Sequence, residues 1–143
     1  ARGQPGPAVA APPSRIEGIG RPTPEPSFIA GCVDAMVKVP DALALAGMRY
    51  VNRRLGRRVG GSTGTNFVGV LAAAQAMRAR GEAGSIVTIL CDGGERYDHS
   101  YYNPGWYADE GIDVESADRI IAAAADGDGA LPDLQPVSRH ARP

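Results

Sequence analysis

The stretch RRVGGSTGTNFVGVLAAAQAM, residues 57–77, joins a polar, glycine-dense turn to a long apolar pattern. Apolar residues recur in it at the spacing of one helical face, which predicts a helix over residues 65–81. These residues are Phe67, Val70, Leu71, Ala74 and Met77. The glycines let backbone N–H groups approach a small ligand at the positive end of this helix. The turn is not a Walker phosphate loop, because Ser62 stands where that motif has its lysine.

Short apolar runs alternate with helical patterns on either side of this stretch. Residues 33–39 and 57–61 predict short strands, and residues 85–91 form a continuous apolar run typical of a strand buried on both faces. Residues 42–56 predict the helix between the first two strands. The order βαβαβ predicts an α/β fold with three layers and a mostly parallel sheet.

Glycine-rich turns follow the last two predicted strands, at residues 60–66 and 91–97. Ligands of open parallel sheets bind beyond the carboxyl ends of the strands, so the two turns are expected to form one site. The plainer alternative is a tight strand-to-helix turn in which Ser62 or Thr65 caps the helix. At the preceding helix, Asp41 is expected as N-cap and Gly56 as the terminating glycine.

Composition limits the classes of function. The 143 residues carry a net charge of −1 and 43% hydrophobic residues, which suits one modest core and shows no basic bias toward nucleic acid. Cys32 and Cys91 form neither a disulfide framework nor metal-ligand spacing. No apolar run of about 18 residues or secretory leader is visible, so we expect a cytoplasmic protein without a membrane span.

The chain divides into three parts by composition. Residues 1–15 are rich in Pro, Gly and Ala and are expected to be disordered, residues 16–113 carry the patterned domain, and residues 114–143 are expected to form a weak helix and a disordered tail. In that helix, expected over residues 114–126, two isoleucines should dock on the core. They are Ile120 and Ile121.

Other polar and aromatic residues have plainer structural explanations. His99 and His140 lack partners at metal-ligand spacing and are expected to be solvated. An aromatic group is expected to pack the carboxyl-terminal loop over the sheet: Tyr97, Tyr101, Tyr102, Trp106 and Tyr107. Four arginines are expected to form a solvated helix end: Arg53, Arg54, Arg57 and Arg58.

Three unusual segments occur in an order that is typical of one enzyme family. They are EGIGRP (17–22), GGSTGTN (60–66) and VTILCDGGERYDHSYYN (87–103). Over about residues 14–113 this arrangement resembles the carboxyl-terminal half of the cysteine synthase and cystathionine β-synthase family. These are pyridoxal-phosphate enzymes of fold type II, with a tryptophan-synthase-β-like fold, so the resemblance implies a partial domain of that kind.

The resemblance also implies cofactor-binding residues. Ser62 matches the serine whose hydroxyl binds the pyridine nitrogen of pyridoxal 5′-phosphate. Cys91 and Asp92 match positions beside the ring, where many relatives have proline and serine. Gly18, Ile19 and Gly20 match the mobile loop that lines the substrate entrance and faces the cofactor, and Gly18 is the loop residue expected to bind it. The GERY turn, residues 94–97, is expected to be structural, with an ion pair from Glu95 or Arg96.

The family's cofactor lysine, asparagine-bearing substrate loop and phosphate cradle lie in its amino-terminal half and have no match here; Lys38 fits none of them. The resemblance implies a carboxyl-terminal fragment of a transferase or lyase that performs β-replacement on an activated serine with sulfide or another thiol. Its expected partners are an amino-acid substrate and the missing half or a second copy, and alone it is expected to be inactive. A non-catalytic remnant and an unrelated anion-binding α/β module remain as alternatives.

Overall fold

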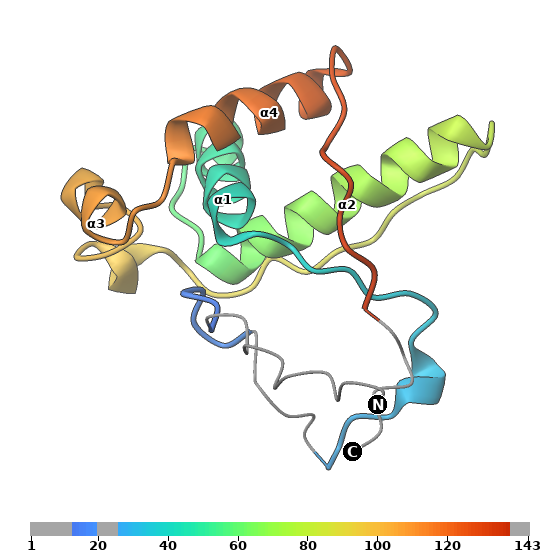
Figure 1. Ribbon diagram of the computed structural model, residues 1–143, viewed down its shortest axis with the longest axis horizontal. Coiled ribbons are helices and arrows are strands. Elements are labelled where there is room, and N and C mark those ends of the chain that lie inside the picture. The colour runs from blue at the N-terminus through green and yellow to red at the C-terminus, as the bar shows by residue number, and fades with distance from the viewer. Residues whose placement is uncertain (1–12, 20–25, 138–143) are drawn as a thin grey trace, which may run out of the picture.

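The computed structural model describes residues 13–19 and 26–137 (Figure 1). These residues build a helical domain in which α1 crosses the amino-terminal end of the longer α2, and α4 lies on α1. The elements, with η for a 3-10 turn, are η1 (Ala30–Cys32), α1 (Asp41–Leu55), α2 (Gly61–Ala79), η2 (Glu95–Tyr97), α3 (Pro104–Asp109) and α4 (Val114–Asp126). None of the helices in the described ranges has the length and apolar character needed to cross a membrane.

The predicted three-layer α/β fold with a parallel sheet is wrong, because the described residues contain helices and no strand. Of the runs expected to be strands, residues 33–39 and 57–61 each contribute one residue to an isolated antiparallel bridge. The bridges join Val37 to Pro136 and Val59 to Gly93. A strand exists only when a neighbour takes up its backbone hydrogen bonds, and here residues 85–91 lie along a helix instead.

Helix α1 begins at Asp41 and ends at Leu55, one residue from the predicted limits. Gly56 terminates it with a positive φ of 65°, as expected for a left-handed C-cap. The prediction that Asp41 is the N-cap is wrong. Pro40 holds that position, and Asp41 is the first helical residue, so its carboxylate is free to bind another segment.

Helix α2 begins earlier than predicted, at Gly61, with Gly60 as its N-cap. Neither Ser62 nor Thr65 caps it, because both hydroxyls lie inside the first turns. The glycine turn is therefore part of the helix itself. It places the backbone N–H groups of Gly61 and Ser62 at the positive end of a 19-residue helix.

The crossing of α1 and α2 is a backbone-to-backbone contact at Gly47 and Gly64. A Cβ built on Gly64 would lie 1.9 Å from the carbonyl oxygen of Ala44 and 2.5 Å from the amide nitrogen of Met48. On the other helix, a Cβ on Gly47 would lie 2.8 Å from the carbonyl oxygen of Gly64. Only glycine at these positions permits the observed separation of the helix axes, which in turn fixes where the turn before Ser62 stands.

The hydrophobic core lies between α1, α2 and α4 and extends to the loop at Ile16 and to the buried tyrosines between residues 97 and 107. Its largest fully buried side chains are Ile16, Leu45, Met48, Val68 and Ile121. The helix predicted over residues 114–126 is confirmed as α4, whose N-cap Asp113 accepts a hydrogen bond from the amide of Ser116 at 3.0 Å. Of the two isoleucines expected to dock, Ile121 is fully buried, whereas Ile120 is 36% exposed and faces away from the core.

The segment after α4 returns across α2 (Figure 1). Gln75 of α2 donates to the carbonyl of Gly129 and accepts from the amide of Leu131, so that one side-chain amide holds both sides of Ala130. The segment then meets residues 36–38 through two backbone hydrogen bonds of 2.9 Å. Residues 129–137 therefore bind both α2 and the segment preceding α1.

Residues 82–92 are exposed throughout and run antiparallel to α2. The side-chain amide of Asn66 donates to the carbonyl of Ile89 at 3.0 Å, and the amide of Cys91 donates to Thr63 Oγ1 at 3.0 Å. The apolar side chains of this segment remain in contact with water: Ile86, Val87, Ile89 and Leu90. The sequence around them lacks charge from residue 83 to residue 91, so nothing opposes association of two such segments.

We expect the isolated chain to self-associate through this segment and Val87→Lys to reduce the association. Val87 is 93% exposed, so lysine costs no packing there, and it places charge in the apolar run. Sedimentation velocity over a range of concentrations measures the effect. Ala79→Lys, at the exposed end of α2, adds the same charge outside the run and should change nothing. Equal loss of association in both variants would contradict a specific role of residues 86–90.

Candidate functional site

The amino-terminal end of α2 brings together the three segments that the sequence singles out. The turn contacts Asp92 at Gly60 and Ile16, from the loop at residues 14–19, at Gly61. Figure 1 shows that loop beside the amino-terminal end of α2. These segments come from distant parts of the chain, and their meeting defines the candidate site.

Ser62 lies in the first turn of α2 and is half-buried. Its hydroxyl has no hydrogen-bond partner among the described residues, and the same holds for the backbone N–H groups of Gly61 and Ser62. Thr63, the next residue, is buried and accepts from the amide of Cys91. The turn therefore offers hydrogen-bonding groups at Ser62, while its neighbour is committed to the fold.

Asp92 is held against the turn by two contacts. Its backbone carbonyl accepts from the amide of Gly60 at 3.0 Å, and its carboxylate accepts from the hydroxyl of Tyr97 at 2.6 Å. A Cβ on Gly60 would lie 2.1 Å from Asp92 Oδ1, so only glycine admits this approach. The carboxylate thus stands near the positive end of α2, where negative charge is favoured.

Cys91 precedes Asp92 and is exposed as a free thiol. Its sulfur lies 3.5 Å from the side-chain nitrogen of Asn66. Cys91 and Asp92 line a cavity of about 90 Å³, whereas pockets for small molecules measure about 300 Å³ or more. Its other lining residues are Arg57, Arg58, Val59, Leu90, Gly93 and Glu95. This cavity is too small to enclose a cofactor.

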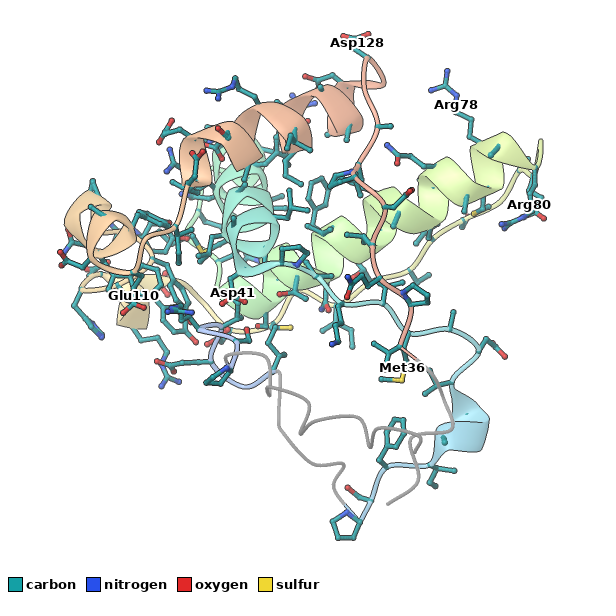
Figure 2. All side chains as sticks on the ribbon, viewed as in Figure 1. Met36, Asp41, Arg78, Arg80, Glu110 and Asp128 are labelled. Carbon is teal, nitrogen blue, oxygen red and sulfur yellow. The ribbon has the colours of Figure 1, made fainter. Side chains whose placement is uncertain are left out.

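The loop at residues 14–19 is fixed at several points. Both carboxylate oxygens of Asp41 are used, one by the hydroxyl of Ser14 and one by the amide of Arg15, each at 2.7 Å. The guanidinium of Arg15 pairs with Glu110. Figure 2 shows Asp41 and Glu110 on the same side of the molecule, where α1 begins and α3 ends. Gly18 has a φ of 82°, so glycine suits this point of the loop.

The two buried tyrosines of the site remain protonated at neutral pH. Burial raises the pKa of Tyr97 above its usual range, and the hydrogen bond to Asp92 acts in the same direction. Burial likewise raises the pKa of Tyr101. Both phenol groups therefore act as hydrogen-bond donors. The charge of the site comes from Asp92, Glu17 and the neighbouring arginines.

The GERY turn forms η2, and its expected ion pair is observed: Arg96 binds Glu17 of the loop at 3.3 Å. The aromatic residues between 97 and 107 do pack, as predicted. They pack against the helical core and the loop, however, because there is no sheet in the described chain. His99 is exposed, as expected. Ile19 is half-buried in the loop, whereas Gly20 and His140 lie outside the described residues.

The four arginines expected at a solvated helix end are exposed, but some of them also contact other side chains. Arg58 pairs with Asp98 and stacks on the ring of Tyr102, and Arg54 lies over Tyr50. Lys38 is exposed, and its backbone amide binds the carbonyl of Gln135. No group of three or more potential metal ligands occurs in the ranges that the structure describes.

Sequence reasoning missed the residues that hold the site together. Asp41 was assigned to a helix cap, and the tyrosines to packing alone. The hydroxyl of Tyr101 binds partners up to 86 residues away, which no local pattern reveals. The only available signal was the density of tyrosines between residues 97 and 107.

Comparison with known proteins decides the family. The L-cysteine desulfhydrase of Mycobacterium tuberculosis is 52% identical over 100 residues, which are 70% of this chain and 27% of that protein. A putative cysteine synthase of Sinorhizobium fredii is 37% identical over 97 residues, 68% of this chain and 27% of that protein. Over this matched region the chain belongs to the cysteine synthase family.

A third relative agrees with this assignment. The cysteine synthase of Dictyostelium discoideum is 28% identical over 109 residues, which are 76% of this chain and 28% of that protein. No family model and no solved structure matches the chain. The chain thus spans about a quarter of the length of the curated cysteine synthase relatives that it matches.

Proposed function

We propose that this chain forms one wall of a pyridoxal-phosphate site in a cysteine-synthase-like enzyme, with Ser62 at the pyridine nitrogen. The convergence of residues 14–19, 60–62 and 91–92 at the amino-terminal end of α2 carries the proposal. Membership of the cysteine synthase family supports it independently. The remaining walls would come from parts of the enzyme that correspond to regions of the relatives outside the matched segment.

The residues present fit the nitrogen edge of the cofactor. Ser62 offers an unengaged hydroxyl within the described structure, beside the free N–H groups of the first helical turn. When bound, pyridoxal phosphate supplies an electron sink for chemistry at an amino acid. A neutral hydroxyl does not force protonation of the ring nitrogen, and the positive end of α2 acts in the same direction. This environment favours β-elimination and β-replacement.

Asp92 and the loop with Gly18 would border the same ligand. Asp92 is oriented by Tyr97 and by the amide of Gly60, so its position is set before any ligand binds. Gly18 and Ile19 follow the anchored residues 14–17 and would limit access of substrate to the turn. None of these residues supplies the amine needed to bind pyridoxal phosphate covalently, so this chain alone should be inactive.

Two reactions are compatible with this site: one relative is a putative cysteine synthase, which would form cysteine, and another is a desulfhydrase, which breaks it down. A cysteine synthase would join an activated serine to sulfide, while the more similar desulfhydrase suggests release of sulfide from L-cysteine. We favour the second reaction for the enzyme of which this chain would form one wall, because the identity to the desulfhydrase is 52% against 37% to the putative synthase. The two reactions are distinguished by measuring sulfide release from L-cysteine and, separately, cysteine formation from an acylated serine and sulfide.

The proposal is tested by mixing the chain with the amino-terminal part of the Mycobacterium tuberculosis relative, which the family resemblance implies carries the cofactor lysine. We expect a yellow complex that retains pyridoxal phosphate on gel filtration. Ser62→Ala should weaken cofactor binding about fivefold, the value of one hydrogen bond of about 1 kcal/mol. Ser116→Ala, in α4, removes a hydroxyl elsewhere and should leave binding unchanged. Binding that is insensitive to Ser62→Ala would contradict the proposed role of Ser62.

A further inference from the structure

The hydroxyl of Tyr101 holds the loop on both sides of Ile16. It donates to the carbonyl of Arg15 at 2.9 Å and accepts from the amide of Glu17 at 2.9 Å. Tyr101 is 3% exposed, so water does not compete for either bond. A phenol that donates and accepts at once takes the place of backbone partners for the carbonyl of Arg15 and the amide of Glu17.

Ile16, between the two bonded residues, is pressed against the turn. It is 2% exposed, and a Cβ on Gly61 would lie 3.1 Å from its Cγ2. The same Cβ would lie 3.0 Å from Cε2 of Tyr101. Both the loop and its tyrosine therefore touch the backbone of the residue immediately before Ser62.

A second tyrosine extends this connection to Asp92. The rings of Tyr97 and Tyr101 stack with centroids 4.6 Å apart and planes 20° apart. Tyr97 in turn donates to the carboxylate of Asp92, whose backbone carbonyl binds the amide of Gly60. The stacked pair thus contacts both glycines of the turn, Tyr97 at Gly60 and Tyr101 at Gly61.

We infer that Tyr101 is a positioning residue for the candidate site, which keeps the loop carrying Gly18 in place beside Ser62. The inference rests on the proposed function in one respect only: the ligand beside that loop is taken to be pyridoxal phosphate. The anchors at Asp41 bind the loop before Ile16, and Arg96 binds the Glu17 side chain at the exposed surface. Among the described residues, Tyr101 alone binds the backbone on both sides of Ile16.

Tyr101→Phe in the full chain tests this directly, because it keeps the ring and its stacking on Tyr97. We expect hydrogen exchange at the amide of Glu17 to accelerate about tenfold, with little change in the melting temperature. The control is Tyr50→Phe, which removes a hydroxyl that binds Asp126 and touches neither loop nor turn. Unchanged exchange at Glu17 would overturn the inference.

The cofactor gives the second readout. In the complex with the amino-terminal part of the relative, Tyr101→Phe should weaken pyridoxal-phosphate binding about fivefold while the complex still assembles. If Ser62→Ala weakens binding and Tyr101→Phe does not, the positioning role is wrong and the proposed function stands. If the unmodified complex fails to bind pyridoxal phosphate, the proposed function fails, and with it the role of Tyr101 toward that cofactor.

Discussion

Gly64→Ala is expected to lower the free energy of unfolding by about 3 kcal/mol or more, the upper end of overpacking effects. The new Cβ would lie 1.9 Å from the carbonyl oxygen of Ala44, which belongs to the backbone of α1 and cannot rotate away. The helices would have to separate, and the contacts of Met48 and Val68 in the core would be lost with them. Urea denaturation followed by circular dichroism measures the change.

Gly69→Ala is the matched control for this substitution. It lies in the same helix, and a Cβ there meets nothing within 4 Å. Alanine has a higher helix propensity than glycine, so Gly69→Ala should raise stability by about 0.5–1 kcal/mol. The two variants therefore differ in sign, although the chemical change is the same. A similar effect of both would contradict the close crossing at Gly47 and Gly64.

The crossing also explains why the candidate site depends on the core. Gly64 lies two residues after Ser62, so any separation of α1 and α2 moves the turn, together with Asp92 that is bound to it, relative to the loop. Asp41, which anchors the loop, is the first residue of α1. Both sides of the site are thus attached to the two helices that cross at Gly64.

The sequence predicted α1, α2 and α4, because their signals are local, but it did not predict the short α3. Apolar periodicity located α1 and α2, Gly56 marked a helix end, and the pattern over residues 114–126 matched α4 to the residue. The start of α2 was missed by four residues, because glycines in the first turn resemble a loop. The capping role of Asp41 was also wrong, because a carboxylate at a helix start can equally bind a neighbouring segment.

The prediction of a sheet was wrong because a strand forms only beside a neighbouring strand, and a local sequence pattern does not identify that neighbour. Residues 85–91 have the composition of a buried strand, yet Val87 is 93% exposed and lies beside a helix. The grouping of the three segments was easier to predict than the fold, whereas the cofactor-binding roles of their residues stay predictions. Three motifs indicated that Ser62, Asp92 and the Gly18 loop should gather, and residues 14–19, 60–62 and 91–92 do meet at one helix end. Their side-chain anchors, Tyr101 above all, required the structure.

Ile121→Ala is expected to lower the free energy of unfolding by about 2–5 kcal/mol, the range for buried isoleucine, leucine or methionine. Ile121 is completely buried where α4 packs on α1, and its removal leaves a cavity beside a rigid helix pair. Ile120→Ala removes the same atoms one position earlier, at a side chain that is 36% exposed. Its cost should stay within about 1 kcal/mol, because burial is partial and alanine favours the helix. Urea denaturation of both variants therefore reports which face of α4 meets the core, and equal losses would mean that α4 is rotated from the orientation described.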